Sequence, residues 1–127
     1  MEIILDTNFL ITAVKNKIQL FEALEDFQGN VLIPTQVISE LKILKEDPKL
    51  KTIEKNSVNL ALQLIKIKKI KKIDFQGKDA DAGFVRYCKN HDTTIATLDR
   101  ILKSKIKTVN KNTKFLTIKE KKRIALQ

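Results

Sequence analysis

The sequence predicts an α/β fold in which helices cover both faces of a central, mostly parallel sheet. Short apolar runs alternate along the chain with longer segments of helical periodicity, and parallel neighbouring strands need crossover connections of this kind. The 127 residues fit one domain, and a content of 43% hydrophobic and 31% charged residues is typical of a globular chain. We therefore expect residues 1–127 to form a single three-layer sandwich.

Apolar or alternating runs predict the strands of this sheet. The predicted strands are Glu2–Leu5, Val31–Ile33, Ile70–Asp74, Thr93–Leu98 and, as an edge strand, Ile106–Val109. Asp6 directly follows the first of them and Asp99 directly follows the fourth.

Helical periodicity fills the intervals between the strands. The predicted helices are Phe9–Val14 and Leu20–Phe27, which form an opening pair, then Thr35–Leu44, Lys49–Lys66 and Asp79–Asn90. Residues 111–127 form a basic C-terminal segment, which we expect to be peripheral and either to finish in a short helix or to stay loosely attached.

Positive charge is concentrated in the second half of the chain. The net charge is +10, made up of −3 over residues 1–50, +5 over residues 51–100 and +8 over residues 101–127. Such a surface attracts polyanions, because each neutralised phosphate releases counterions. However, 22 of the 25 basic residues are Lys, so coding bias remains an alternative explanation.

Other features of the sequence exclude several classes of protein. The only cysteine, Cys88, allows no internal disulfide and is typical of a reducing compartment, and no apolar run is long enough for a membrane span. The sequence also lacks a glycine-rich phosphate loop, a cysteine and histidine cluster for zinc and an aromatic stacking platform. We expect a cytoplasmic protein with no membrane attachment.

Two acidic residues, Asp6 and Asp99, end predicted strands. In open parallel sheets, ligands bind outside the carboxyl ends of the strands, where the strand order reverses. The two carboxylates converge if their strands are neighbours. The alternative is that each residue only caps the helix that follows it.

Two further acids lie on predicted helices at inward positions. At about 100° per residue, Glu40 falls within the apolar arc of its helix, between Leu44 and Ile43. A carboxylate turned toward a core is costly unless it is paired or bound to metal, so the alternative for Glu40 is a salt bridge to a lysine at the rim.

Asp81 leads a second apolar stripe. It is followed at positions i+3, i+4 and i+7 by Phe84, Val85 and Cys88, whereas Asp79 projects to the opposite side and is expected to be an N-terminal cap.

Four acids from four segments would repel one another without a counter-charge. Carboxylates without a cysteine or histidine cluster suit Mg²⁺ or Mn²⁺, and the implied chemistry is metal-assisted hydrolysis of a phosphodiester.

These acids occur within short motifs that resemble those of the PIN-domain ribonuclease family. The motifs are Leu5-Asp6-Thr7-Asn8, Glu40, Ala80-Asp81 and Ala96-Thr97-Leu98-Asp99-Arg100, in this order over nearly the whole chain. The stretch from Ala80 to Lys103 is most similar to the PIN nucleases of ribosomal RNA processing, although relatives in that subgroup often carry a second Asp where this chain has Ala82. VapC-type toxins are also similar.

The resemblance implies a Rossmann-like, five-stranded sheet with Asp6, Glu40, Asp81 and Asp99 as catalytic and metal-binding residues. It also implies supporting roles for Thr7, Asn8 and Thr97, bound Mg²⁺ or Mn²⁺, single-stranded RNA as substrate, and a homodimer. We expect basic residues of the second half to grip the RNA, namely Lys78, Arg86, Arg100 and Lys103.

The leading hypothesis is a metal-dependent endoribonuclease that acts in ribosomal RNA or other RNA processing. One alternative is a VapC-like toxin ribonuclease with a small antitoxin protein as partner. Another is a non-catalytic RNA-binding or ribosome-assembly module with the same fold.

Overall fold

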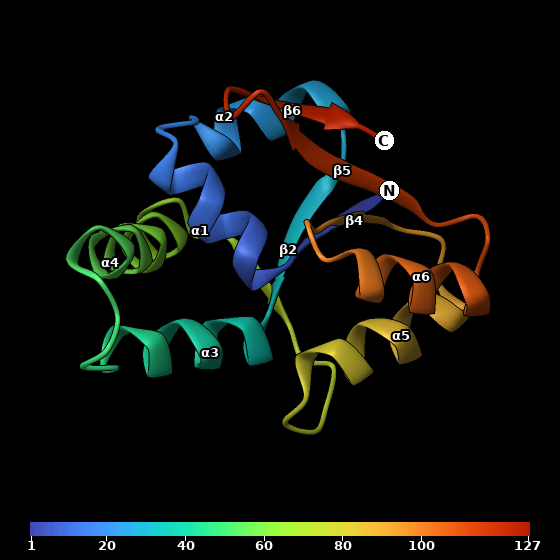
Figure 1. The fold of residues 1–127 in the computed structure, drawn as a ribbon. Helices are drawn as coiled ribbons and strands as arrows, with labels where there is room; N and C mark the ends of the chain where they lie inside the picture. Colours follow the sequence, from blue (N-terminus) through green and yellow to red (C-terminus); the bar gives the residue numbers. More distant parts are fainter.

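A six-stranded sheet forms the centre of the protein, whose computed structural model describes all residues from 1 to 127 (Figure 1). The strand order is β3-β2-β1-β4-β5-β6. Every neighbouring pair is parallel except β5 and β6, which are antiparallel. The strands are β1 (Glu2–Leu5), β2 (Asn30–Pro34), β3 (Lys71–Ile73), β4 (Thr94–Ala96), β5 (Lys114–Lys119) and β6 (Arg123–Leu126).

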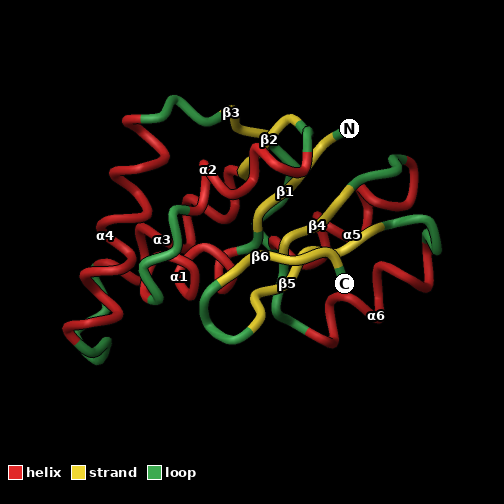
Figure 2. The backbone as a smooth tube through the Cα atoms, turned by 90° about the horizontal axis from the view of Figure 1, so that it is seen from above, coloured by secondary structure: helices red, strands yellow, loops and turns green.

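Helices cover the sheet in two groups, which gives the expected three layers (Figure 2). Helices α1 (Thr7–Lys15), α3 (Thr35–Lys45) and α4 (Thr52–Ile67) pack together on one side. Helices α5 (Ala80–Asn90) and α6 (Arg100–Val109) pack against each other on the other side. A short helix α2 (Leu20–Leu24) continues into a 3-10 turn (Glu25–Phe27) before β2. None of these helices has both the length and the apolar character needed to span a lipid bilayer.

The predicted α/β class, the mostly parallel sheet and the five predicted helical segments are confirmed, with shifts of a few residues at their ends. The number of strands was wrong, because the sheet has six strands rather than five. The expected edge strand at Ile106–Val109 is the end of α6. Its buried residues, Leu102 and Ile106, are four apart, which is helical rather than alternating spacing.

The last two strands come instead from residues 111–127, where we expected a short helix or a loosely attached end. Phe115 and Leu116 are buried in β5, which pairs with β4, and β6 folds back beside it. Residues 120–122 connect the two strands, and Glu120 and Lys121 each have a φ of 57°. Two consecutive left-handed residues are typical of a type I′ hairpin turn, which usually carries Asn or Gly. This turn has neither residue, so a hairpin could not be predicted here from the sequence.

The core fixes the position of β1, the strand from which the candidate site extends. Ile3, Ile4 and Leu5 are at most 1% exposed, because β1 lies between β2 and β4 with helices on both faces. Each helical layer contributes a large aromatic side chain to the core, since Phe9 of α1 and Phe84 of α5 are completely buried. The carboxyl end of β1 is therefore held by packing from every side.

Replacing Gly83 by Ala should destabilise the protein. A Cβ atom at this position would lie 2.6 Å from the Cβ of Phe75, so helix α5 and the segment before it would have to move apart. Such overpacking costs about 1–3 kcal/mol and should outweigh the roughly 1 kcal/mol by which Ala favours a helix over Gly. Urea unfolding would measure the change against Ser104→Ala on the exposed side of α6. An increase in the free energy of unfolding for Gly83→Ala would contradict this account of the packing.

Candidate functional site

The carboxyl ends of β1 and β4 lie side by side at the point where the strand order reverses. Ile3, Ile4 and Leu5 pair with Thr94, Ile95 and Ala96, and the backbone N–H of Asp6 donates to the carbonyl of Ala96 at 3.0 Å. The predicted condition for Asp6 and Asp99 to converge, namely neighbouring strands, is thus confirmed. In this class of sheet such a position is where ligands bind.

Asp6 is the buried member of the site, with 6% of the residue exposed. Its carboxylate accepts hydrogen bonds from the backbone N–H of Thr7 at 2.8 Å and from the hydroxyl of Thr97 at 2.7 Å. Thr97 is completely buried, and its Oγ1 also accepts the backbone N–H of Asp99 at 3.1 Å. One threonine therefore connects the ends of both strands.

Glu40 joins the site from helix α3. Its carboxylate accepts the hydroxyl of Thr7 at 2.9 Å, and Thr7 itself is 4% exposed. The alternative of a salt bridge to a lysine at the rim is not observed, because the salt bridges of the protein are Lys15 with Glu54 and Lys68 with Glu22.

Asp81 and Asp99 complete the group, which we call the acidic site (Asp6, Glu40, Asp81, Asp99). Asp81 lies in the first turn of α5, and Asp79 caps that helix by accepting the N–H groups of Asp81 and Ala82, as predicted. Asp99 caps α6 by accepting the N–H groups of Ile101 and Leu102 at 2.9 and 3.1 Å. The capping role proposed as the alternative for Asp99 is therefore real, and one of its carboxylate oxygens has no protein donor.

The expectation that Glu40 and Asp81 turn into the core was wrong, since both residues are exposed. Their apolar neighbours on the helices are buried, as expected, with Val37, Leu41 and Phe84 completely inaccessible. A helical wheel gives the direction of a side chain around the helix axis but not the depth of the layer beyond it. At these two positions the inward direction meets the open edge of the sheet rather than packed side chains.

Charge repulsion links Asp6 with Asp81 and Glu40, and Asp81 with Asp99. Burial raises the pKa of Asp6 to about 6; the hydrogen bonds from Thr97 and Thr7 oppose this rise, and the charges of Asp81 and Glu40 add to it. The pKa of Asp81 is also raised, first by burial and then by Asp99 and Asp79, and Lys105 opposes the rise. None of the four carboxylates has a salt-bridge partner, so the acidic site carries unbalanced negative charge.

The chemistry of this donor set fits a divalent metal ion of the hard class. All of the available ligands are carboxylate or hydroxyl oxygens, and an acid with a raised pKa gains most from a nearby cation. No three His, Cys, Asp or Glu side chains are already grouped closely enough to hold a metal between them. Mg²⁺ does not require such a cage, because it keeps several waters and needs one or two protein carboxylates.

The predicted supporting residues divide into two kinds. Thr7 and Thr97 hydrogen-bond to acids of the site, as described above. Asn8 is exposed, lines a hollow with Ile11 and Leu44, and makes no hydrogen bond to the acids.

The predicted RNA-binding residues are dispersed. Lys78 lines a hollow of about 680 Å³ together with Glu40, and Arg100 is exposed directly after Asp99. Lys103 donates to the side chain of Gln127 at the end of the chain. Arg86 has a local structural role, since its guanidinium donates to the carbonyls of Phe75 and Gln76 at 3.0 and 2.6 Å.

Sequence reasoning missed Gln36, which shapes the wall beside Glu40. It is 6% exposed, and its amide nitrogen donates to Asp74 at 3.0 Å and to the carbonyl of Gly77 at 2.9 Å. Its amide oxygen accepts the backbone N–H of Phe75 at 3.3 Å. The available signal was its position in the first turn after a buried strand, one residue before the fully buried Val37.

Comparisons with known proteins point to one family over nearly the whole chain. The model of a family described as a PIN like domain matches residues 3–121. The chain is also 34% identical to Ribonuclease VapC4 of Methanocaldococcus jannaschii, in an alignment that covers 95% of this chain and 92% of that protein.

Replacing Asp6 by Asn should stabilise the metal-free protein at neutral pH. The folded pKa of about 6 lies above the ordinary value of 3.8, so protonation favours the folded state. The free energy of unfolding of the wild type should rise as the pH falls from about 6 to about 4, and at neutral pH the ionised carboxylate is a cost of about 3 kcal/mol. Asn removes that cost and should flatten this part of the pH profile.

Urea unfolding with and without Mn²⁺ would measure both effects. Mn²⁺ should stabilise the wild type and Asp26→Asn, an exposed control, but not Asp6→Asn. Equal stabilisation of all three proteins by Mn²⁺ would contradict a metal site at Asp6.

Proposed function

We propose that this chain, which belongs to the PIN-domain family, is an endoribonuclease that hydrolyses phosphodiester bonds in RNA with the help of Mg²⁺ or Mn²⁺. The observation that supports it most is the acidic site itself, with acids from four elements at the switch point of the sheet and no salt bridge to balance them. The ribonuclease named among the relatives supports RNA as the substrate class.

In this proposal the four carboxylates of the acidic site would hold the metal ion, with Glu40 supplied by helix α3. A bound divalent cation supplies a Lewis acid that neutralises charge developing on the phosphodiester. The two buried threonines are positioning residues. Thr97 keeps one Asp6 oxygen in place, and Thr7 holds the carboxylate of Glu40 through its hydroxyl.

Substrate binding in this proposal depends on the basic second half of the chain. Arg100 and Lys78 border the acidic site and suit the phosphates on either side of the cut. Arg86 holds the segment around Phe75 and Gln76 and thereby the position of Lys78. We expect little base selectivity, because phosphate contacts carry no sequence information.

Within this activity, the named relative favours a VapC-type toxin ribonuclease with a small protein antitoxin as partner. The motif similarity of Ala80 to Lys103 favours the alternative of an RNA-processing nuclease. A homodimer is compatible with either. The two candidates share one chemistry and differ in the RNA that is cut and in the effect on growth.

Asparagine substitutions at Asp79 and Asp81 provide a matched test of catalysis. Asp81→Asn should lower cleavage of a single-stranded RNA in Mg²⁺ or Mn²⁺ by about 100-fold, since even groups that only support a metal ligand are worth ~10–100-fold. Asp79→Asn should stay within about threefold of the wild type, because Asn also caps helices well. Asp6→Asn should behave as Asp81→Asn does. Undiminished cleavage by Asp6→Asn would refute the metal-dependent mechanism, and the absence of any cleavage by the wild type would favour the RNA-binding module.

Expression in a bacterial host would separate the toxin from the processing nuclease. If the protein is a toxin, expression of the wild type should arrest growth. Expression of Asp6→Asn should not, because this variant keeps the RNA-binding surface but loses the central acid. RNA crosslinked to Asp6→Asn in cells would identify the target. Normal growth together with crosslinks confined to ribosomal RNA precursors would instead support the processing function.

A further inference from the structure

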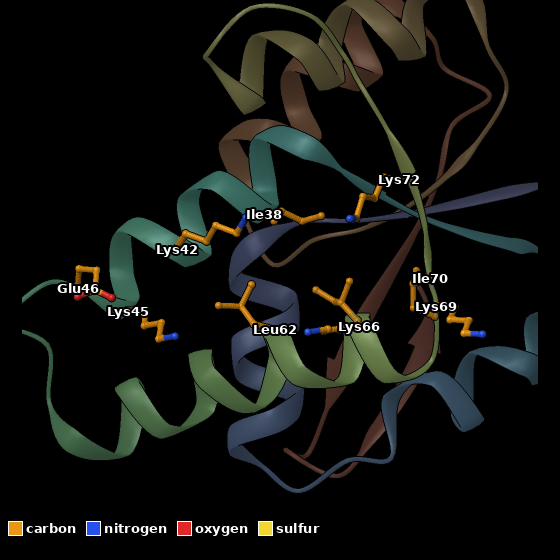
Figure 3. A pocket seen from close by; sticks show the side chains of 10 residues that line it. Ile38, Lys42, Lys45, Glu46, Leu62, Lys66, Lys69, Ile70 and Lys72 are labelled. Atoms are coloured by element: carbon orange, nitrogen blue, oxygen red, sulfur yellow. The ribbon is translucent and has the colours of Figure 1, made fainter.

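A groove of about 1000 Å³ runs between helices α3 and α4 and is bordered at one end by the start of β3 (Figure 3). We call it the lysine groove. Its walls come from α3 and from the C-terminal half of α4, and the two helices pack against each other. At this volume it reaches the upper end of the range of about 300–1,000 Å³ that is typical of ligand pockets.

The rim of the groove is strongly basic. Five lysines line it, namely Lys42, Lys45, Lys66, Lys69 and Lys72, against the single acid Glu46. None of the five ammonium groups forms a salt bridge within the protein. Lys42 lies on α3 and Lys66 lies on α4, so the two walls of the groove each carry a lysine (Figure 3). A concentration of unpaired like charge at a concave surface favours an acidic partner.

The floor of the groove is aliphatic, formed by Ile38, Leu62, Ile65 and Ile70. No aromatic ring lines it. Bases of single-stranded RNA bind without sequence preference by stacking on aromatic side chains, so this floor offers RNA no platform. It suits aliphatic side chains instead.

The lysine groove is separate from the acidic site. Ile38, Lys42 and Lys45 line the groove, whereas Ser39, Glu40 and Ile43 line the hollow beside Asp74 and Lys78. Successive members of each set are three or four positions apart or adjacent, so the two sets occupy different faces of α3. An RNA strand at the acids would have to cross the helix to reach the groove.

We propose that the lysine groove is the docking site of an acidic amphipathic helix of a partner protein. Aliphatic side chains at intervals of three and four residues on that helix would pack on the floor, which is the usual mode of helix recognition in grooves. Glu and Asp residues that flank this stripe would pair with the lysines of both rims. The inference does not depend on ribonuclease activity, because it concerns a different face of α3.

A labelled peptide would test the proposal in the absence of RNA and metal. The probe is a peptide of about 15 residues, long enough to form a helix, with Leu at every third or fourth position and Glu between. Fluorescence anisotropy should detect binding to the wild-type protein. The double variant Lys42→Glu with Lys66→Glu should weaken binding about tenfold or more, since each reversal replaces an attraction by a repulsion.

Two controls distinguish docking from attraction by net charge. Lys89→Glu with Lys111→Glu changes the total charge equally at exposed positions outside the groove and should leave binding within about twofold. Leu62→Gln changes no charge and should weaken binding about fivefold, because it places a polar group on the aliphatic floor.

Three results would overturn the proposal. The first is no binding of the peptide to the wild-type protein. The second is an equal loss of binding in the two double variants. The third concerns a single-stranded RNA of similar length that binds the wild type more tightly than the peptide does. If its affinity falls in the Lys42→Glu with Lys66→Glu variant and does not change in Leu62→Gln, the lysine groove is an RNA-binding surface. Each lysine changed is exposed, so the variants are expected to fold.

Discussion

The burial of the Asp6 carboxylate between two parallel strands is the constraint on which the rest of the site depends. Two threonines satisfy its oxygens, and each also contacts a further part of the site. Thr97 accepts the backbone N–H of Asp99, and Thr7 donates its hydroxyl to Glu40. A continuous series of hydrogen bonds thus runs from α6 across the two central strands to α3. Because its middle members are inaccessible to water, the outer acids are positioned by the packing of the core and not by flexible loops alone.

This arrangement is costly for the folded state. Asp6, whose pKa is raised by burial and by neighbouring charge, destabilises the protein whenever it is ionised, and no lysine or arginine forms a salt bridge with it. The core supports that cost, because Ile3, Ile4 and Leu5 are inaccessible and lock the strand that carries Asp6. The rule that buried charge is paired is broken at one place in the chain, and such exceptions are expected at functional sites.

Periodicity and strand-end position predicted most of the fold and the adjacency of Asp6 and Asp99, because both follow from side-chain direction along one element. The sequence does not show how deeply a side chain is buried below the surface. For that reason Glu40 and Asp81 were expected inside the core, whereas they are exposed at its open edge. The β5–β6 hairpin was missed since Glu120 and Lys121 adopt a left-handed turn without Asn or Gly. The hydrogen bonds of Arg86 and Gln36 to the backbone of residues 75–77 were not predicted. Contacts between segments that are distant in sequence leave no local pattern.

The pairing of β1 with β4 joins residues 3–5 to residues 94–96, so the centre of the molecule is built from contacts that are remote along the chain. Chains are synthesised from the N-terminus, and Asp6 therefore emerges from the ribosome long before Thr97 does. Until then β1 has β2 as a neighbour on one side only, and Asp6 lacks the hydroxyl that orients it. A nascent chain of this protein consequently cannot complete its acidic site until residues 94–99 have been synthesised. The direction of synthesis therefore delays the completion of the site relative to β1, the strand on which it is built.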